Sequence, residues 1–521
     1  MIRVADLSVA LDGRPVLQGL SLDLAPGRVT GLVGESGSGK SMTALAVMGL
    51  LPRRARVSGQ VMLDGRDLLA LPERQWCRIR GARIGMIFQE PMTALNPLMT
   101  IGDQVAEALV LHRGLDRRAA LARARERLDR VGLPAPRFPL TLYPHELSGG
   151  QRQRVAIALA VALRPDLLIA DEPTTALDVT TQARILDLLK DLVRDAGMAL
   201  LLITHDLAVV AGLADRVAVM QAGQIVEEGP TEALFRSRSH AYTRQLFAAS
   251  RHRPARPRRA LAPEPLVQVT GAVRDYRTAT RVLRALDGVS VDIGRGESVG
   301  LVGESGCGKS TLARAILGLE ALQDGRITLD GQAVAADQPM PRGLRARMQA
   351  VFQDPFGSFN PRWRVDRLLA EPFHLTGRPP DWRGRVADAL AEVGLHPGDA
   401  RRFIHEFSGG QRQRLAIARA LIIKPALIVL DEAVSALDVR VRAQVLDLLA
   451  RLQADHGLSY LFISHDLSVV RGMADRILVM HQGRIVEEGP PDRIIDAPRH
   501  DQTRSLVAAM PAIPRDWLQL R

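Results

Sequence analysis

Cysteine and aromatic residues are scarce in this chain of 521 residues. Cys77 and Cys307 are the only cysteines, too few for a disulfide framework or a cysteine-ligated metal cluster, and such usage is typical of a reducing cytoplasm. No uninterrupted apolar run approaches the ~18 residues that a membrane-spanning helix needs. The first residues alternate like a strand, and we expect no signal peptide. These absences exclude a disulfide scaffold and predict a chain that does not cross a membrane by itself.

Lysine is also rare, because the chain relies almost wholly on arginine for its net charge of +12. The four lysines are Lys40, Lys190, Lys309 and Lys424. Lys40 and Lys309 lie in two glycine-rich stretches, G-E-S-G-S-G-K-S and G-E-S-G-C-G-K-S. A compact ammonium on a flexible stem can enter a loop and touch phosphate oxygens, whereas a planar guanidinium has a different shape. The retention of lysine at these two positions indicates that both loops are used.

Both stretches fit the pattern G-x-x-x-x-G-K-[ST] of a phosphate-binding loop. In such a loop the backbone N–H groups wrap phosphate oxygens at a helix N-terminus, the lysine reaches the β- and γ-phosphates, and the hydroxyl reaches Mg²⁺. The sequence therefore predicts two nucleotide sites, with the terminal serine of each loop as a magnesium ligand. The first loop consists of Gly34, Glu35, Ser36, Gly37, Ser38, Gly39, Lys40 and Ser41, and the second of Gly303, Glu304, Ser305, Gly306, Cys307, Gly308, Lys309 and Ser310.

Further motifs follow each loop in the same order, which makes the two halves duplicates. The motifs are a glutamine segment (I-F-Q-E-P and V-F-Q-D-P), S-G-G-Q, an apolar run ending in D-E, then A-L-D and H-D. Asp171 to Asp431 and His205 to His465 are each 260 positions apart, whereas the loops are 269 positions apart. Length changes between the halves are therefore confined to their front portions.

The densest basic run, Arg251 to Arg259, lies between the halves among prolines, and we interpret it as a solvated, semi-rigid linker. The other basic residues are spread along the chain, so we expect no nucleic-acid partner. We assign residues 1–250 to the first domain, 251–265 to the basic, proline-rich linker and 266–521 to the second domain.

S-G-G-Q precedes a long apolar-periodic stretch in each half, so its serine and glycines are predicted to lie at a helix start. Free N–H groups and the helix dipole attract anions there, and the duplication argues against an ordinary helix cap. We therefore predict phosphate contacts for both motifs. They consist of Ser148, Gly149, Gly150 and Gln151 in the first half and Ser408, Gly409, Gly410 and Gln411 in the second.

Each D-E pair ends an apolar strand and brings two carboxylates to the phosphate site. We expect the aspartate to bind Mg²⁺ and the glutamate to orient and deprotonate water near the γ-phosphate. The histidine of H-D has a matched place after both D-E pairs, which favours a role in sensing the γ-phosphate. The aspartates are Asp171 and Asp431, the glutamates Glu172 and Glu432, and the histidines His205 and His465.

Alternating strand-like and helix-like stretches around each loop predict an α/β fold, a mostly parallel sheet with helices on its faces. In each half an early alternating stretch, 19–33 or 288–302, predicts a hairpin that leads into a buried strand. Between the glutamine segment and S-G-G-Q the chain is rich in Ala, Leu, Glu and Arg at helical spacing. This segment is predicted to form an inserted helical subdomain.

The order of motifs resembles that of ATP-binding cassette (ABC) ATPases over nearly the whole chain. The resemblance implies two P-loop NTPase cassettes that hydrolyse ATP with Mg²⁺, each with a RecA-like parallel-sheet core, an antiparallel β subdomain and an inserted helical subdomain. It also implies that the cassettes face head to tail, so that each ATP lies between the loop of one half and the S-G-G-Q of the other. Within the glutamine segments it assigns Gln89 and Gln353 to Mg²⁺.

The same resemblance suggests a difference between the two sites. When Ile2 is aligned with Val267, Leu11 falls opposite Tyr276, a position where the family often stacks an aromatic ring on adenine. Stacking of a base on an aromatic side chain contributes ~1–3 kcal/mol. We therefore expect the first site to hold ATP more weakly than the second.

A narrower resemblance rests on the segments E-P-M-T-A-L-N-P and D-P-F-G-S-F-N-P and on the tails H-A-Y-T-R-Q-L and H-D-Q-T-R-S-L. They are similar to ATPases of oligopeptide, dipeptide and nickel importers, and the fused layout resembles microcin/peptide and glutathione importer ATPases. This implies two transmembrane permease subunits and, indirectly, a substrate-binding protein as partners. It also implies peripheral attachment at the cytoplasmic side of the bacterial inner membrane. A soluble tandem ATPase acting on ribosomes or DNA, and a tandem-cassette sugar importer, remain alternatives.

Cys307 takes the place in the second loop that Ser38 has in the first. A thiol so close to a helix N-terminus and to Lys309 is expected to have a lowered pKa and to be reactive. We therefore expect maleimide to label this cysteine and to block ATP hydrolysis.

Overall fold

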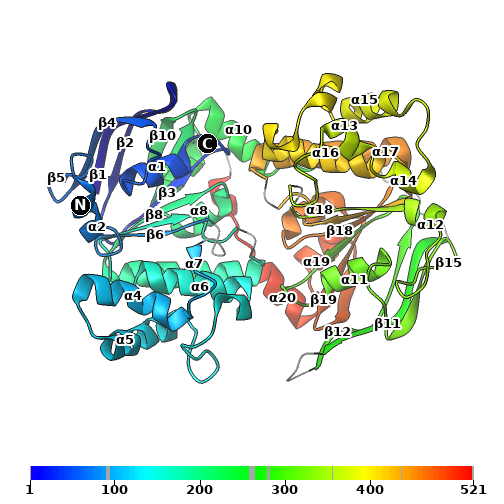
Figure 1. Cartoon of the computed structure of the whole chain (residues 1–521), viewed down its shortest axis with the longest axis horizontal. Helices are drawn as coiled ribbons and strands as arrows, with labels where there is room; N and C mark the ends of the chain where they lie inside the picture. The colour runs from blue at the N-terminus through cyan, green and yellow to red at the C-terminus, as the bar shows by residue number, and fades with distance from the viewer. Residues whose placement is uncertain are drawn as a thin grey trace. The chain divides into compact units, whose positions relative to one another are not determined.

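The chain consists of two units in the computed structural model, which describes residues 2–89, 94–175, 177–256, 264–277, 282–354, 356–435 and 437–518. The first unit comprises Met1–Leu177, Thr181–Arg251 and Pro511–Arg521, and the second comprises Asp178–Thr180 and His252–Met510. Each unit contains one of the two duplicated halves (Figure 1).

The first unit begins with a four-stranded sheet in the order β2-β1-β4-β5, and its neighbouring strands are antiparallel. The hairpin consists of the first two strands, so the prediction of a hairpin within residues 19–33 is wrong, whereas the buried strand expected to follow it is confirmed at residues 29–33. The second hairpin strand pairs with the first, while residues 29–33 belong to another sheet, because a turn at Gly27 separates them. The strands are β1 (Ile2–Leu11), β2 (Arg14–Leu24), β4 (Ala55–Leu63) and β5 (Arg66–Asp67).

A six-stranded sheet forms the core of the first unit, in the order β10-β9-β3-β8-β7-β6. All neighbours are parallel except the antiparallel edge pair β9 and β10. The central strands are buried along their whole length, as expected for a parallel sheet covered by helices. The strands are β3 (Val29–Val33), β6 (Ile84–Ile87), β7 (Leu167–Asp171), β8 (Ala199–Thr204), β9 (Arg216–Gln221) and β10 (Gln224–Pro230).

The helices of the first unit include the predicted inserted subdomain. Figure 1 shows α4, α5 and α6 gathered at one end of this unit, away from the antiparallel sheet. Thr100 and Asp116 cap the first two of them by accepting hydrogen bonds from the N–H groups of Asp103 and Ala119. The helices are α1 (Lys40–Val47), α2 (Glu73–Ile79), α4 (Ile101–Arg113), α5 (Arg117–Arg130), α6 (Gly149–Ala160), α7 (Val179–Ala196), α8 (Leu207–Leu213), α9 (Thr231–Ser237) and α10 (Ala241–Ser250), with a 3₁₀ turn at Pro144–Glu146.

The second unit repeats both sheets of the first, in the orders β12-β11-β14-β15 and β16-β17-β18-β13-β19-β20. The strands of the four-stranded sheet are β11 (Pro265–Arg277), β12 (Val282–Gly294), β14 (Asp324–Leu329) and β15 (Gln332–Ala333). The strands of the six-stranded sheet are β13 (Ser298–Val302), β16 (Met348–Val351), β17 (Leu427–Asp431), β18 (Ser459–Ile463), β19 (Arg476–His481) and β20 (Arg484–Gly489). Only the pair β19 and β20 is antiparallel in this sheet.

Helices cover the second unit as they do the first, and α13, α15 and α16 gather at one end of it (Figure 1). The helices are α11 (Lys309–Ile316), α12 (Arg342–Ala346), α13 (Val365–Leu369), α14 (Phe373–Thr376), α15 (Trp382–Glu392), α16 (Gly409–Leu421), α17 (Val439–His456), α18 (Leu467–Met473), α19 (Pro491–Asp496) and α20 (Asp501–Ala508). The 3₁₀ turns described after the linker are Pro397–Arg401, Ile404–Glu406 and Arg515–Trp517. In the described ranges no helix is both long and apolar enough to span a bilayer.

Residues 252–256 of the linker are part of the second unit. The side chain of Arg256 is only 14% exposed and pairs with Asp475, and Pro254 is buried. The prediction of a solvated linker is therefore wrong for Pro254 and Arg256, whose partner carboxylate offsets the cost of removing the guanidinium from water. His252, Arg253 and Ala255 are exposed as predicted.

Candidate functional site

The two phosphate loops hold their lysines in the same way. Lys40 Nζ donates to the carbonyl oxygens of Gly34 and Glu35, each at 2.8 Å. Lys309 Nζ donates to the matching carbonyls of Gly303 and Glu304, also at 2.8 Å. The two ammonium groups are buried, so each places a positive charge inside its loop, where phosphate oxygens would gain most from it.

The first glycine of each loop has no room for a side chain. A Cβ on Gly34 would lie 2.3 Å from the carbonyl oxygen of Met220, and one on Gly303 would lie 2.2 Å from that of Met480. The backbone of the loop therefore lies directly against the neighbouring strand. This close approach explains why glycine is required there.

The D-E and H-D motifs meet at one edge of the sheet in the first unit. Strands β7 and β8 are parallel, with Asp171 opposite Ile203, so the residues that follow them lie side by side. Nδ1 of His205 lies 3.1 Å from Oε1 of Glu172. The sequence predicted both residues for the phosphate site, and the structure brings them together within hydrogen-bond distance.

Glu172 is held ionised by its neighbours. Burial works against its charge, but the hydrogen bond and charge of His205 prevail and lower the pKa of Glu172 to about 2. Its backbone has a φ of 47°, in the left-handed region that few side chains adopt. Glu432 has a φ of 51° in the second unit. Backbone strain of this kind is typical of functional sites, where the surrounding structure holds a residue in an unfavourable conformation.

The second unit has the same glutamate–histidine pair, with fewer hydrogen bonds to the glutamate carboxylate. Nδ1 of His465 lies 3.3 Å from Oε1 of Glu432. The pKa of Glu432 is lowered, because the hydrogen bond with His465 outweighs burial. The pKa of His465 is raised against its own burial by the same contact. The pair is therefore charged on both members at mildly acidic pH.

Gln89 and Thr175 add two donors to the first glutamate. Gln89 Nε2 and Thr175 Oγ1 each donate to Glu172 Oε2 at 3.0 Å. In the second unit Ser435, which matches Thr175, donates instead to the backbone carbonyl of Glu432 at 2.9 Å. Among the described residues Gln353 makes no hydrogen bond to the carboxylate of Glu432. Thr175 was missed by sequence reasoning, since a threonine two residues after D-E-P has no signal of its own.

Asp171 and Ser41 fit a magnesium ion. Asp171 is 5% exposed, its Oδ1 has no hydrogen-bond partner, and burial raises its pKa, although the Ser41 hydroxyl bonds to its carboxylate. Mg²⁺ prefers carboxylate and hydroxyl oxygens, so a buried carboxylate with an unused oxygen beside a serine is a suitable donor set. In the second unit burial likewise raises the pKa of Asp431.

S-G-G-Q forms the start of a helix in both units, as predicted. Ser148 N donates to Gln151 Oε1 at 2.9 Å, and Gln151 N donates to Ser148 Oγ at 3.4 Å. Ser408 and Gln411 make the same reciprocal pair at the start of α16. The caps use the side chains of these residues, whereas the N–H groups of the first helical positions have no acceptor within the helix. Those N–H groups form an anion-attracting end.

Asp178, the aspartate of the first half's A-L-D motif, belongs to the second unit together with Thr180. Asp178 Oδ2 accepts from the N–H of Ser305 at 3.4 Å, and Thr180 Oγ1 donates to Glu304 Oε1 at 3.1 Å. Both contacts are to the second phosphate loop. The motif's duplication was the signal for these residues, but spacing alone did not assign them a role.

Tyr276 lies at the end of β11, opposite Leu283 of β12. Leu11 has the matching place in the first unit, at the end of β1 beside its own hairpin turn. The guanidinium of Arg274 lies 5.0 Å from the centre of the Tyr276 ring. The Tyr276 ring is thus already in contact with a cation.

The prediction of a lowered pKa for Cys307 is wrong. Cys307 is 6% exposed and packs in the core beneath the loop, where a Cβ on Gly303 would lie 2.8 Å from its Sγ. Burial raises the pKa of the thiol more than Lys309, 3.9 Å away, lowers it. The loop directs this side chain inward, so proximity in sequence to a helix N-terminus does not make it reactive.

Comparison with known proteins matches nearly the whole chain. Residues 17–175 and 286–435 match the family model described as ABC transporter. Residues 226–269 and 486–521 match the model described as oligopeptide/dipeptide transporter, C-terminal region.

Two relatives cover 98% of this chain. The peptidoglycan transport ATP-binding protein YejF of Agrobacterium fabrum is 49% identical over 96% of its own length. The glutathione import ATP-binding protein GsiA of Salmonella typhimurium is 44% identical over 89% of its own length. Among solved structures, the dimeric ATP-binding cassette MJ0796 bound to ADP and Pi aligns with a TM-score of 0.40 and 27% identity, over 43% of this chain and 98% of that one.

We predict that Cys307 reacts slowly with maleimide at neutral pH. Its buried thiol carries less thiolate than an ordinary cysteine, whereas Cys77 is exposed. Mass spectrometry of the intact protein over time should show Cys77 labelled first and Cys307 only after partial unfolding. A Cys307→Ser variant is the matched control, and rapid labelling of Cys307 in the folded wild type would contradict the prediction.

The pair of His465 and Glu432 should stabilise the second unit most under mildly acidic conditions. Because the pKa of His465 is raised above 6.5, its contribution is present below that value and is lost as the pH rises through the raised pKa. Because the pKa of Glu432 is lowered below 4.5, its contribution is present above that value and is lost as the pH falls through the lowered pKa.

The loss of unfolding free energy on His465→Gln should therefore be largest between about pH 4.5 and 6.5 and should shrink at alkaline pH. Urea unfolding across this range measures it. His374→Gln, at an exposed position, should show no such trend. A penalty for His465→Gln that grew with rising pH would be inconsistent with the pair.

Proposed function

Because the chain belongs to the ABC transporter family, we propose that each unit binds ATP on its phosphate loop and hydrolyses it at the edge of its parallel sheet. The chain is the ATP-hydrolysing subunit of an importer of peptides or related small solutes. The observation that carries the site assignment is the half-buried glutamate–histidine pair, which recurs at the strand ends in both units.

The first site uses Lys40 to balance the charge of the β- and γ-phosphates. Asp171 and Ser41 hold Mg²⁺, which when bound neutralises negative charge on the phosphate oxygens. Glu172 then faces the γ-phosphate, and its carboxylate accepts a hydrogen bond from the attacking water. The lowered pKa of Glu172 keeps this carboxylate ionised and able to accept that hydrogen bond, and His205 holds it in place.

The second site uses the equivalent residues Lys309, Asp431, Ser310, Glu432 and His465. Tyr276 supplies a ring face for adenine there, which Leu11 does not supply in the first site. The glutamines Gln89 and Gln353 join the magnesium ligands when ATP is bound, and in the first unit Gln89 already contacts the glutamate.

We propose that each ATP also contacts the S-G-G-Q helix start of the opposite half. The start of each S-G-G-Q helix supports this, because the N–H groups of its first positions have no acceptor within the helix. One site then combines Lys40, Gln89, Glu172 and His205 with Ser408, Gly409 and Gly410, and the other combines Lys309, Gln353, Glu432 and His465 with Ser148, Gly149 and Gly150.

The partners we propose are two permease subunits and, through them, a substrate-binding protein, with the chain attached at the cytoplasmic face of the bacterial inner membrane. The family model for the oligopeptide/dipeptide transporter C-terminal region and two relatives, one named for glutathione and one for peptidoglycan transport, support a cargo with peptide bonds. This cargo class distinguishes the chain from sugar importers and from tandem ATPases that act on ribosomes or DNA.

Replacing Glu172 by Gln should leave ATP binding intact and lower turnover at the first site by ~10²-fold, the scale expected when catalytic help to water is lost. The double variant Glu172→Gln, Glu432→Gln should lower steady-state ATPase activity by the same ~10²-fold, because both sites then lack their glutamate. Glu107→Gln, an exposed change on α4, serves as the control. ATP hydrolysis by the double variant at the wild-type rate would refute the assignment of both glutamates.

The two sites should differ in affinity because of Tyr276. Changing Tyr276 to Leu should weaken ATP binding at the second site by about 1–3 kcal/mol and leave the first site unchanged. Leu11→Tyr should strengthen the first site. Site-resolved titration with a fluorescent ATP analogue measures both, and equal affinity of the Tyr276→Leu and wild-type proteins would show that the ring serves only packing.

A further inference from the structure

Two short segments, at equivalent positions of the two halves, each belong to the unit that consists mainly of the other half. After α10 the chain passes into the second unit at His252, and after α20 it passes into the first unit at Pro511. The helices α10 and α20 match each other in the 260-residue register of His205 and His465. The two crossings fall within one residue of each other in that register. We call residues 252–256 the first strap and residues 511–518 the second strap.

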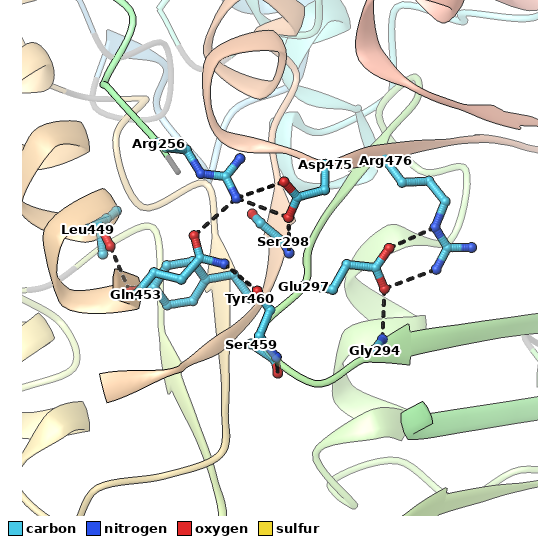
Figure 2. Close-up of polar contacts among 11 residues, drawn as sticks. Arg256, Gly294, Glu297, Ser298, Leu449, Gln453, Ser459, Tyr460, Asp475 and Arg476 are labelled. Atoms are coloured by element: carbon cyan, nitrogen blue, oxygen red, sulfur yellow. Dashed lines mark hydrogen bonds and ion pairs between the residues drawn. The ribbon is translucent and has the colours of Figure 1, made fainter. Parts of the chain in front are cut away.

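The first strap is fastened to the second unit by two polar anchors. His252 Nε2 lies 2.7 Å from Asp447 Oδ1 on α17. Arg256 Nη2 donates to both carboxylate oxygens of Asp475, at 3.1 and 3.0 Å, and to Gln453 Oε1 at 3.0 Å. Figure 2 shows the guanidinium reaching these two side chains. Between the anchors Pro254 is buried and lies near Gly472 of α18, where an added Cβ would meet its ring at 3.4 Å.

The carboxylate that receives Arg256 also supports the strand leading to the phosphate loop. Asp475 Oδ2 accepts from the N–H of Ser298, the first residue of β13, at 2.8 Å. In the first unit Asp215 accepts from Val29 at the same place, but its ion-pair partner is the neighbouring Arg28, at 2.9 Å. The first unit therefore completes this site with a residue of its own.

The second unit lacks that local arginine. Glu297 stands where the first unit has Arg28, and its carboxylate is occupied by Arg476 and by the N–H of Gly294 (Figure 2). Arg256 of the first strap thus supplies the cation that Asp475 would otherwise lack. The first strap is therefore an integral part of the second unit, because its Arg256 completes the ion pair of Asp475.

The second strap is fastened to α9 of the first unit. Asp516 forms an ion pair with Arg236, whose guanidinium also donates to the Asp516 carbonyl at 2.7 Å. The Trp517 ring meets the edge of Phe235, with centroids 5.9 Å apart and planes at 81°. Arg238 Nη2 donates to the carbonyl of Leu518 at 3.3 Å. The side chains of this strap pack against the buried aromatic cluster of the first unit.

The anchors of the two straps carry opposite charges at equivalent positions. Arg256 and Asp516 match in the 260-residue register, and each meets the opposite charge in its seat. The position equivalent to Arg236 in the second unit is Asp496, which is paired with Arg471. An aspartate in that place would repel Asp516, so the charge of the second strap fits the first unit and not the equivalent position of the second.

We propose that the two straps are reciprocal clasps that keep the cassettes paired when no nucleotide joins them. Each strap is covalently continuous with one half and is seated by side-chain contacts in the unit of the other half. Pro254 and Pro514 match in register and restrict both backbones before they are seated, which lowers the entropy cost of docking. Hydrolysis can then open the ATP sites without separating the two cassettes.

The test replaces residues 257–263 with a protease recognition sequence of equal length in the full chain. Cleavage there leaves the first strap on one fragment and the second strap on the other. Without nucleotide, the cut protein should elute from a sizing column as one particle of the uncut size. The assay contains no ATP, so its outcome does not depend on the ATPase or transport assignments.

Removing the anchors of both straps should separate the fragments. The cut protein with Arg256→Ala and without residues 511–521 should elute as two smaller species, while the cut protein with Arg253→Ala and Arg515→Ala, two exposed arginines of the straps, should remain whole. Thermal unfolding of each uncut variant verifies that it is folded. The proposal would be overturned if the fragments of the cut wild-type chain separated. It would also be overturned if the fragments of the variant with Arg256→Ala and without residues 511–521 stayed together.

A charge reversal provides a second readout that a folding defect cannot imitate. In cut protein that already carries Arg256→Ala, the change Arg236→Asp should weaken fragment association at least tenfold, and adding Asp516→Arg should restore it. Because these two residues lie at the surface of the first unit, their reversal leaves the core intact. Failure of the second change to restore association would show that the ion pair does not fasten the strap.

Discussion

The parallel pairing of β3, β8 and β7 is the constraint on which the rest of each unit depends. It aligns Val33 with Thr204 and Asp171 with Ile203, so that three segments far apart in the chain end at one edge of the sheet. The phosphate loop, the D-E pair and the H-D motif each follow one of these strands. A buried lysine, a buried aspartate and a glutamate–histidine pair are thereby concentrated where water is largely excluded and electrostatic interactions are strong.

The two sites share this frame but differ in how firmly the glutamate is held. In the first unit Glu172 receives donors from His205, Thr175 and Gln89. In the second unit the matching serine bonds to the backbone, and His465 is the partner that sets the charge of Glu432. A duplicated chain can thus vary the two ATP sites through single hydroxyl and amide groups while the sheet register stays the same.

Fusion of the two halves in one chain affects the straps as well as the ATP sites. Two independent copies of one cassette would have identical surfaces, and nothing would prevent a strap from docking on its own kind. Within one chain the two anchors carry opposite charges, and Glu297 stands where the first unit has Arg28. In the second unit the linker residue Arg256 pairs with Asp475.

Much of the chemistry was determined by the sequence alone, because the phosphate loops, S-G-G-Q, D-E and H-D are contiguous motifs whose residues act together wherever the fold places them. Their repetition also predicted the α/β class and the two halves. Three features were decided only by the tertiary structure. Cys307 is buried rather than reactive, Arg256 is anchored rather than solvated, and residues 511–518 belong to the first unit. Each depends on burial or charge supplied by residues distant in sequence, and local spacing contains no information about such partners.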